Sequence, residues 1–156
     1  MSEQQFEINR IYVKDVSTEA PHSPEIFQVS WEPEINLNLN NSARALDEEK
    51  GFYEVSLTLT VTATLGEQTA YVIEVEQAGI FTLKGFEQDQ QAYVIGAMIP
   101  NILFPYARET ISTLSQKAGF PAMLLNPIDF NGLFQQHLQS QAQQSDTADE
   151  GEQTQH

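Results

Sequence analysis

Residues 53–65 constrain the fold most strongly, because apolar and polar side chains alternate there almost without exception. The apolar side chains occupy the odd positions, which are Tyr53, Val55, Leu57, Leu59, Val61, Ala63 and Leu65. The even positions carry Glu54, Ser56, Thr58, Thr60, Thr62 and Thr64. A period of two residues is typical of a β-strand with one buried face and one solvent-exposed face. We therefore predict a strand here, in a sheet that is covered on one side only.

Three further segments read as strands of the same sheet. Gly66-Glu67-Gln68 predicts a short hairpin connection into a strand that runs from Tyr71 toward Phe81, with Tyr71, Ile73 and Val75 on one face. Residues 35–40 alternate apolar side chains with asparagines, and residues 6–16 are extended in character. The close hairpin signals favour an antiparallel arrangement. Residues 20–33, between the first two strands, contain three prolines and the only tryptophan, which predicts a long extended connection.

The pattern becomes helical after Gly85. Leu103, Ala107, Ile111, Leu114 and Ala118 follow helical spacing, and Gly119 followed by Pro121 predicts where that helix ends. Within the apolar run 96–109, Pro100 and Pro105 each remove an amide donor and clash with the carbonyl four residues earlier. We therefore expect an interrupted helix that is shaped to a particular packing partner.

A second helix is predicted to begin at Phe130, with Asp129 as its N-terminal cap. Phe130, Leu133, Phe134 and Leu138 share one face of this helix. Apolar residues then become scarce, and residues 145–156 contain four acidic residues and no basic one. We predict one folded domain over residues 1–144 and a disordered acidic tail over residues 145–156.

Charge and targeting signals limit the possible partners. The formal net charge is −15, from 22 acidic and 7 basic residues, which argues against binding to nucleic acid or to an anionic membrane. The first residues lack the basic and apolar regions of a secretory signal, and prolines interrupt the most apolar window, residues 92–107. That window is also shorter than the ~20 residues of a membrane helix. Together with the absence of cysteine, these features predict a soluble cytoplasmic protein.

The sequence contains none of the common enzyme motifs that we considered. No phosphate-binding loop, dinucleotide fingerprint, nucleophile elbow or zinc-binding helix motif is present. His22, His137 and His156 each lack a second ligand nearby in the sequence, so we expect no metal site. Glu74 and Glu76 share a strand face, but a solvated face does not offer the cleft that acid–base catalysis needs. We expect no enzymatic activity and no cofactor.

The content of aromatic residues leaves two interpretations open. Nine phenylalanines, five tyrosines and one tryptophan exceed the obvious need of a small core. They could serve ordinary burial and oligomerisation. Alternatively, Phe27 and Trp31 on the extended connection, beside an amphipathic helix, could line a groove for unfolded or extended peptide.

The two-proline run closely resembles the hallmark segment of the SecB family of bacterial protein-export chaperones. That segment is Ile99-Pro100-Asn101-Ile102-Leu103-Phe104-Pro105-Tyr106-Ala107-Arg108-Glu109. Supporting matches occur in order at residues 10–15 (RIYVKD), 19–21 (EAP), 31–34 (WEPE), 61–63 (VTA), 65–67 (LGE), 79–81 (GIF), 127–130 (PIDF) and 133–134 (LF). The resemblance covers about residues 5 to 140. Ala78 is a departure, since a glycine commonly precedes Gly79 in the family.

The resemblance implies an α+β fold, with a four-stranded antiparallel Greek-key sheet and two helices packed on one face. It also implies a homotetramer, assembled as a dimer of dimers in which the long first helices lie between two sheets. Members of the family act without ATP, keep precursor proteins unfolded before translocation, and deliver them to the motor ATPase SecA.

The resemblance also assigns roles to individual residues. Carried over by position, the residues that would bind the unfolded client are Trp31, Ile35, Leu37, Phe134 and Leu138. Those that would bind SecA are Asp15, Glu19, Val72 and Glu74, and those that would form the oligomer interface are Ile73, Val75, Ile102 and Tyr106. Two other functions remain open at this point: a SecB-like chaperone dedicated to a toxin–antitoxin pair, and a module that binds a small ligand in an apolar pocket.

Overall fold

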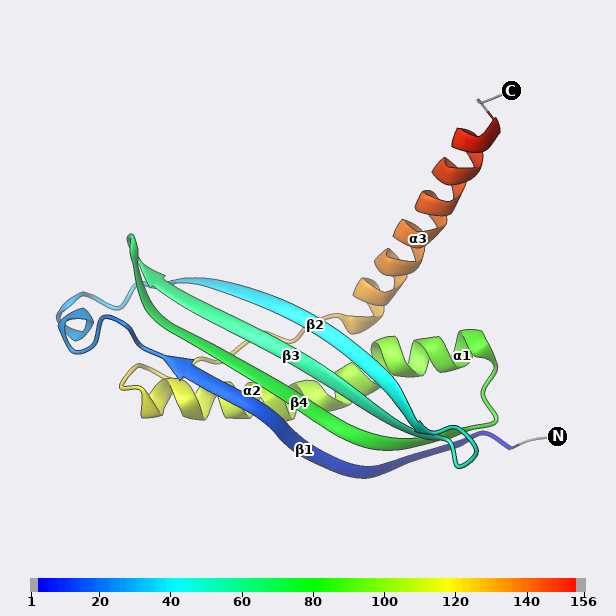
Figure 1. The fold of residues 1–156 in the computed structure, drawn as a ribbon. Coiled ribbons are helices and arrows are strands. Elements are labelled where there is room, and N and C mark those ends of the chain that lie inside the picture. Colours follow the sequence, from blue (N-terminus) through cyan, green and yellow to red (C-terminus); the bar gives the residue numbers. More distant parts are fainter. Residues whose placement is uncertain (1–2, 154–156) are drawn as a thin grey trace.

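A computed structural model describes residues 3–153. Its elements are β1 (Gln5–Glu19), a short 3₁₀ helix (Glu25–Gln28), β2 (Glu34–Asp47), β3 (Phe52–Leu65), β4 (Gln68–Lys84), α1 (Gln88–Tyr93), a π-helical turn (Val94–Met98), α2 (Ile99–Lys117) and α3 (Phe130–Gln153). All four predicted strands are present, and each extends beyond the segment that the alternation had marked. The elements are labelled in Figure 1.

The strands form one antiparallel sheet in the order β1-β4-β3-β2. Strands β2, β3 and β4 follow one another as hairpins, and the long connection 20–33 carries the chain across to the opposite edge, which is a Greek-key arrangement. Gly66 occupies the β3–β4 turn with a φ of +63°, a conformation that glycine adopts without strain. The predicted fold class, α+β with this sheet, is confirmed.

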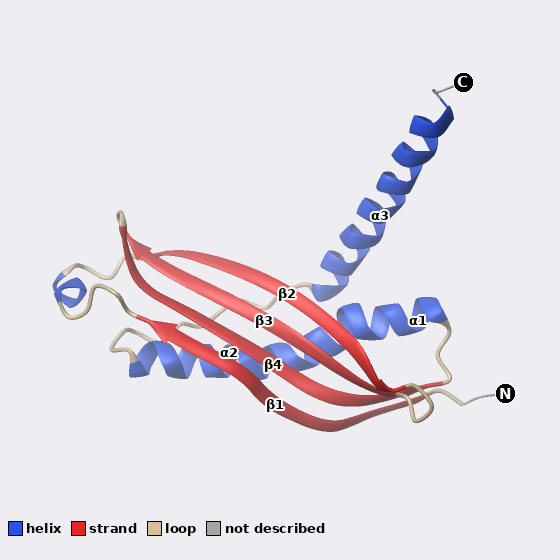
Figure 2. Cartoon of the chain, viewed as in Figure 1, coloured by secondary structure: helices blue, strands red, loops and turns tan. Residues whose placement is uncertain are grey.

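The hydrophobic core lies between the sheet and α2, which crosses one face of the strands (Figure 2). The odd-numbered side chains of β3 from Val55 to Leu65 all lie on this buried face, as the alternation predicted. Leu103, Ala107 and Ile111 of α2 are completely buried against them. Within residues 3–153, no helix covers the other face of the sheet (Figure 2).

The helix α2 ends where the sequence predicted. Gly119 has a φ of +97°, and the Phe120 amide donates to the Ser115 carbonyl at 3.0 Å, a hydrogen bond that closes the end of the helix. The side chain of Ser115, which is fully buried, accepts from the Met123 amide at 2.9 Å and ties the following loop to the helix.

The two prolines have different consequences. The helix changes from α to π over Val94–Met98, immediately before Pro100, whereas α2 continues through Pro105. In the π-helical turn the Ile99 amide donates to the Val94 carbonyl, so the next carbonyl, that of Ile95, would need a donor at position 100. Proline has no such donor, and the side-chain amide of Asn41 on β2 donates to the Ile95 carbonyl instead, at 3.3 Å. The predicted interruption is therefore confirmed at Pro100 only.

The last helix differs from the expectation in two respects. It contacts the helical segment 93–104 with its first turns and then projects away from the sheet, rather than lying flat on it (Figure 1). It also runs to Gln153, so residues 145–153, predicted above as part of a disordered tail, continue α3 in this structure, and residues 154–156 lie outside the described residues. The glutamines, alanines and acidic residues of this stretch, with no proline, are compatible with a continued helix.

Candidate functional site

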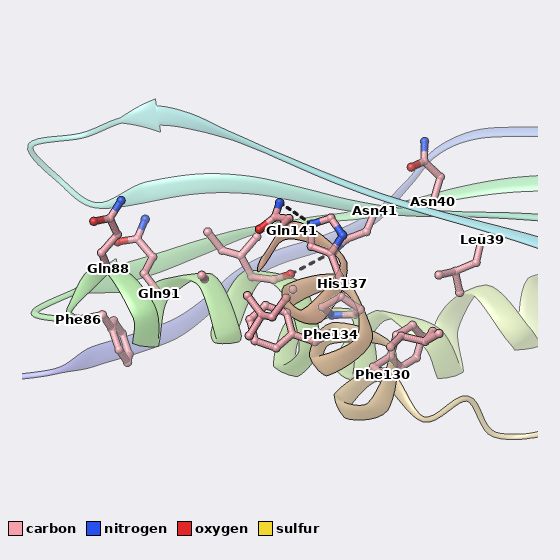
Figure 3. Close-up of a pocket in the computed structure, with 16 residues that line it drawn as sticks. Leu39, Asn40, Asn41, Phe86, Gln88, Gln91, Phe130, Phe134, His137 and Gln141 are labelled. Atoms are coloured by element: carbon pink, nitrogen blue, oxygen red, sulfur yellow. Dashed lines mark hydrogen bonds between the residues drawn. The ribbon is translucent and has the colours of Figure 1, made fainter. Parts of the chain in front are cut away.

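A groove of about 880 Å³ opens between the free edge strand β2 and the helices (Figure 3). Its walls come from three segments that are distant in the sequence: residues 39–41 of β2, residues 86–100 around α1 and the π-helical turn, and residues 130–141 of α3. Apolar and aromatic side chains, among them Leu39, Phe86 and Phe134, alternate with the side-chain amides of asparagine and glutamine. None of its lining residues is Asp, Glu, Lys or Arg. We call this cavity the long groove.

A small set of contacts holds α3 as one wall of the long groove. The Phe134 ring lies against Gly96 in the π-helical turn and meets the Tyr93 ring edge-on, with 5.7 Å between centroids. The Tyr93 hydroxyl donates to Asn131 Oδ1 at 2.9 Å. At the helix start the Gly132 amide donates to Asp129 Oδ1 at 3.0 Å, which confirms Asp129 as the predicted cap.

The long connection and the end of α2 form a second, smaller groove of about 320 Å³. Its floor is an aromatic cluster in which Phe120 lies 5.1 Å from Phe27, 5.2 Å from Trp31 and 5.1 Å from Tyr71, between ring centroids. Tyr71 is fully buried and its hydroxyl has no hydrogen-bond partner among the described residues. Burial raises the pKa of Tyr71 to about 12. We call this cavity the aromatic groove.

The five residues predicted to bind client are divided between these surfaces. Phe134 and Leu138 line the long groove, and Trp31 lines the aromatic groove. Ile35 and Leu37 lie on β2 between Trp31 and Leu39, with their side chains on the same face of the sheet as the buried Ala63 and Val61 with which they pair. Together they trace one path along the edge of the sheet from the aromatic groove to the long groove.

Sequence reasoning missed several lining residues. Leu39, Phe86 and Ile95 line the long groove, and Phe120 lines the aromatic groove beside Phe27, which the sequence had already suggested as a groove residue. Leu39 continues the alternation of Ile35 and Leu37, so its position in the strand pattern was a usable signal. Phe86, Ile95 and Phe120 stand next to glycine or at element ends, and no periodic pattern marks them.

The four residues predicted to bind SecA lie on the uncovered face of the sheet. Glu19 of β1 pairs directly with Val72 of β4, and Glu74 and Glu76 pair with Ser17 and Asp15. Direct cross-strand partners point to the same side, so Asp15, Glu19, Val72 and Glu74 share one face. That face is opposite to the one on which Ile35 and Leu37 lie, since Val72 and Glu74 alternate with the core residues Ile73 and Val75.

A cluster around Glu54 lies on the same outer face, beside the acidic residues. The Glu54 carboxylate accepts from the Tyr12 hydroxyl, from Lys14 Nζ at 2.9 Å and from Arg44 Nε at 3.0 Å. The hydrogen bond from Tyr12, followed by that from Lys14, lowers the pKa of Glu54 to about 2. Burial and the neighbouring Glu54 carboxylate raise the pKa of Tyr12 to about 12.

Comparison with known proteins identifies the family of the chain. The family model "SecB: Preprotein translocase subunit SecB" matches residues 1–141. The chain belongs to the SecB family. It is 49% identical to the "Protein-export protein SecB" of Methylococcus capsulatus over 94% of this chain and 93% of that protein. It is 51% identical to the protein of the same name from Alkalilimnicola ehrlichii, over 90% of this chain and 73% of that one.

A solved structure has the same SecB-like fold. The Mycobacterium tuberculosis Rv1957 SecB-like chaperone, in complex with a ChAD peptide from the Rv1956 HigA1 antitoxin, superposes with a TM-score of 0.66 at 17% sequence identity. The match covers 79% of this chain and 90% of that chain. The chain is therefore a protein-export chaperone of the SecB family, as the two-proline segment indicated.

The four residues predicted to form a SecB-type oligomer interface differ in exposure within one chain, and their role in assembly stays a prediction. Ile73 and Val75 are completely buried beneath α2 of the same chain, so their side chains belong to its core. Ile102 is half-buried on α2, and Tyr106 is 47% exposed one turn later. On the edge strand β1, Ile8, Val13 and Val16 are also exposed.

Metal-binding groups and membrane-spanning helices were also considered for the described part of this SecB chain. Among residues 3–143, whose side chains the structure describes, no three His, Asp or Glu side chains are grouped in a way that could hold a metal ion. In the same range, none of the helices combines the length and the apolar character needed to cross a membrane.

Proposed function

We propose that this chain captures unfolded precursor proteins along the path from the aromatic groove to the long groove and keeps them competent for export. The observation that carries the proposal is the long groove itself, about 880 Å³ in volume, with apolar walls and no charged carboxylate, ammonium or guanidinium group among its lining residues. Membership of the SecB family and about 50% identity to protein-export proteins support it.

The chemistry of the grooves suits a binder of many different chains. Burial of apolar side chains yields ~25 cal/mol per Å² whatever the sequence around them, so aromatic and aliphatic client residues would bind without a fixed motif. The amides of Asn40, Gln88 and Gln91 at the long groove can donate to and accept from an extended client backbone. None of these contacts requires nucleotide hydrolysis, in keeping with ATP-independent action.

We also propose that Asp15, Glu19, Val72 and Glu74 bind a basic segment of SecA. A net charge of −15 would steer a basic partner toward this face over a range of ~8 Å at physiological salt. Because this face is opposite to the client path, SecA could bind while a client is still held. Handover would then require only that SecA compete for the same precursor.

We propose further that the chain works in the cytoplasm as a homotetramer, a dimer of dimers. Ile102 and Tyr106 of α2, together with exposed Ile8, Val13 and Val16 of β1, support an apolar contact with another copy. Several client paths on one assembly would add avidity, since each further client segment binds intramolecularly.

The function is tested by arrest of refolding. A reduced, unfolded substrate protein is diluted into buffer with and without the chaperone, and recovery of its native fluorescence is followed. We expect the wild-type chain to delay recovery and to co-elute with the substrate in size-exclusion chromatography. Leu138→Asp should abolish both effects, because it places a charge in the apolar wall of the long groove. A wild-type chain that ignores unfolded protein would refute the proposal.

The matched control separates the two faces. Asp15→Ala combined with Glu74→Ala should abolish binding of the basic SecA tail and leave substrate capture unchanged. Equal loss of both activities would mean that the division of the surface is wrong. Capture of one antitoxin peptide, with no effect on other unfolded proteins, would instead favour a dedicated chaperone. A small ligand that fills the long groove while unfolded chains do not bind would favour a ligand-binding module.

A further inference from the structure

The edge strand β1 breaks the rule that side chains alternate from one residue to the next. Its register with β4 shifts between Ile8 and Arg10 and again between Val13 and Asp15, which leaves Asn9 and Lys14 as extra residues at two β-bulges. The residues whose side chains share the core-facing side of the sheet are Phe6, Ile8, Ile11, Val13 and Val16. Their spacing of two, three, two and three residues follows the two bulges.

The second bulge decides which way the acidic end of β1 faces. Tyr12 pairs with Ala78 and points outward, so strict alternation would turn Lys14 outward and Asp15, Ser17 and Glu19 inward. The extra residue at Lys14 changes this parity. Asp15 instead pairs with Glu76, and Glu19 with Val72, on the outer face. Without the bulge, two of the four proposed SecA-binding residues would face the wrong side.

The bulge is anchored by hydrogen bonds from β1 to one carboxylate, that of Glu54. Lys14 Nζ lies 2.9 Å from Glu54 Oε1, and the Tyr12 hydroxyl donates to the same carboxylate. Glu54 is on β3, so these bonds reach across β4 and fix β1 on both sides of Val13. The Glu54 side chain is only 11% exposed, whereas that of Lys14 is 41% exposed. The carboxylate of Glu54, which is shielded from solvent, thus binds Lys14, the extra residue of the bulge.

We propose that Lys14 and Glu54 are a positioning pair for the SecA-binding face: their ion pair holds the β-bulge that turns Asp15 and Glu19 outward. The proposal rests on the SecA docking proposed above and names what orients that surface. Neither residue needs to touch SecA.

The variant Lys14→Met distinguishes a positioning role of Lys14 from a purely electrostatic one. The change removes a positive charge beside Asp15, so electrostatics alone would tighten the binding of a basic peptide. A positioning role predicts weaker binding of the peptide instead, because the bulge loses its anchor. We expect Lys14→Met to bind a synthetic peptide of the basic SecA tail about tenfold more weakly than wild type, through misplaced charges. Lys14→Arg, which retains a donor to Glu54, should bind within about twofold of wild type.

Two control measurements complete the experiment. Asn9→Ala removes the hydrogen bond from Asn9 Nδ2 to Thr82 Oγ1 at the other bulge, and it should leave peptide binding unchanged. Refolding arrest by Lys14→Met should equal that of wild type, since the client path lies on the opposite face. Amide chemical shifts of residues 13–19 should change in Lys14→Met and not in Lys14→Arg.

Each result bears on a different proposal. If wild type binds the peptide and Lys14→Met binds it equally well or more tightly, the positioning role is refuted and SecA docking stands. If wild type does not bind the peptide, both are refuted. If Asn9→Ala weakens binding as much as Lys14→Met does, the effect is a general loosening of β1 and the specific pair is refuted.

Discussion

The ring of Phe134 rests directly on the backbone of Gly96, so closely that a Cβ atom at Gly96 would lie 2.7 Å from Phe134 Cδ2. Gly96 belongs to the π-helical turn, and Phe134 to the second turn of α3. The contact therefore joins the two helical walls of the long groove, and it depends on the absence of a side chain at position 96.

Gly96→Ala should displace α3 and weaken client capture. Alanine at a helical position normally stabilises a protein by roughly 0.5–1 kcal/mol relative to glycine. Here the new methyl group would push the Phe134 ring away, so we expect a lower melting temperature and weaker binding of an unfolded substrate. Thermal unfolding and substrate titration measure the two effects. A raised melting temperature with unchanged binding would show that the ring moves aside at no cost.

Asn41 and Pro100 should be energetically coupled through the Ile95 carbonyl. In the wild type the Asn41 amide donates to that carbonyl, so Asn41→Leu would leave a partly buried acceptor without this donor, at a cost of about 1 kcal/mol. Pro100→Ala restores an amide donor at position 100. In that background Asn41→Leu should cost about 1 kcal/mol less. Urea unfolding of the four proteins of the cycle gives the coupling energy. Strictly additive effects would contradict the proposed link.

The regular parts of the fold could be predicted because their signals are local. The alternation of residues 53–65, the turn at Gly66, the stop at Gly119 and the cap at Asp129 each depend on neighbours within a few residues. The bulges of β1 were not predicted, because residues 6–16 were identified only as extended in character. The irregular spacing of its apolar residues carried the information.

The groove could not be predicted in the same way. Its walls are residues 39–41, 86–100 and 130–141, which are brought together only by the path of the chain around the sheet. The burial of Ile73 and Val75 within the chain's own core could not be predicted for a related reason. A strand pattern shows that a face is apolar, but it does not show whether α2 of the same chain or a second copy covers that face.

Tyr106 and Val75 should respond oppositely in tests of assembly and stability. Tyr106→Glu places a charge on an exposed apolar position of α2, so it should reduce the proposed tetramer to smaller species while the fold persists. Val75→Ala creates a cavity in the core, so it should lower the free energy of unfolding by about 1–3 kcal/mol and leave assembly unchanged. Analytical ultracentrifugation and urea unfolding measure the two properties. An unchanged sedimentation coefficient for Tyr106→Glu would remove that residue from the interface.

Glu54 should make the stability of the fold depend on pH in the acid range. The pKa of Glu54 is lowered from 4.5 to about 2 in the folded chain, chiefly by the hydrogen bond from Tyr12 and then by that from Lys14. A carboxyl group with a lowered pKa contributes stability that is present above pH 4.5 and is lost as the pH falls toward 2. Glu54→Gln cannot titrate, so the gap in unfolding free energy between wild type and variant should narrow through this window. Tyr12→Phe should raise the pKa of Glu54 and move the loss to higher pH. Urea unfolding at a series of pH values measures both effects. If the difference in unfolding free energy between wild type and Glu54→Gln stays constant between pH 4.5 and 2, the pKa of Glu54 is not lowered by its partners in the fold.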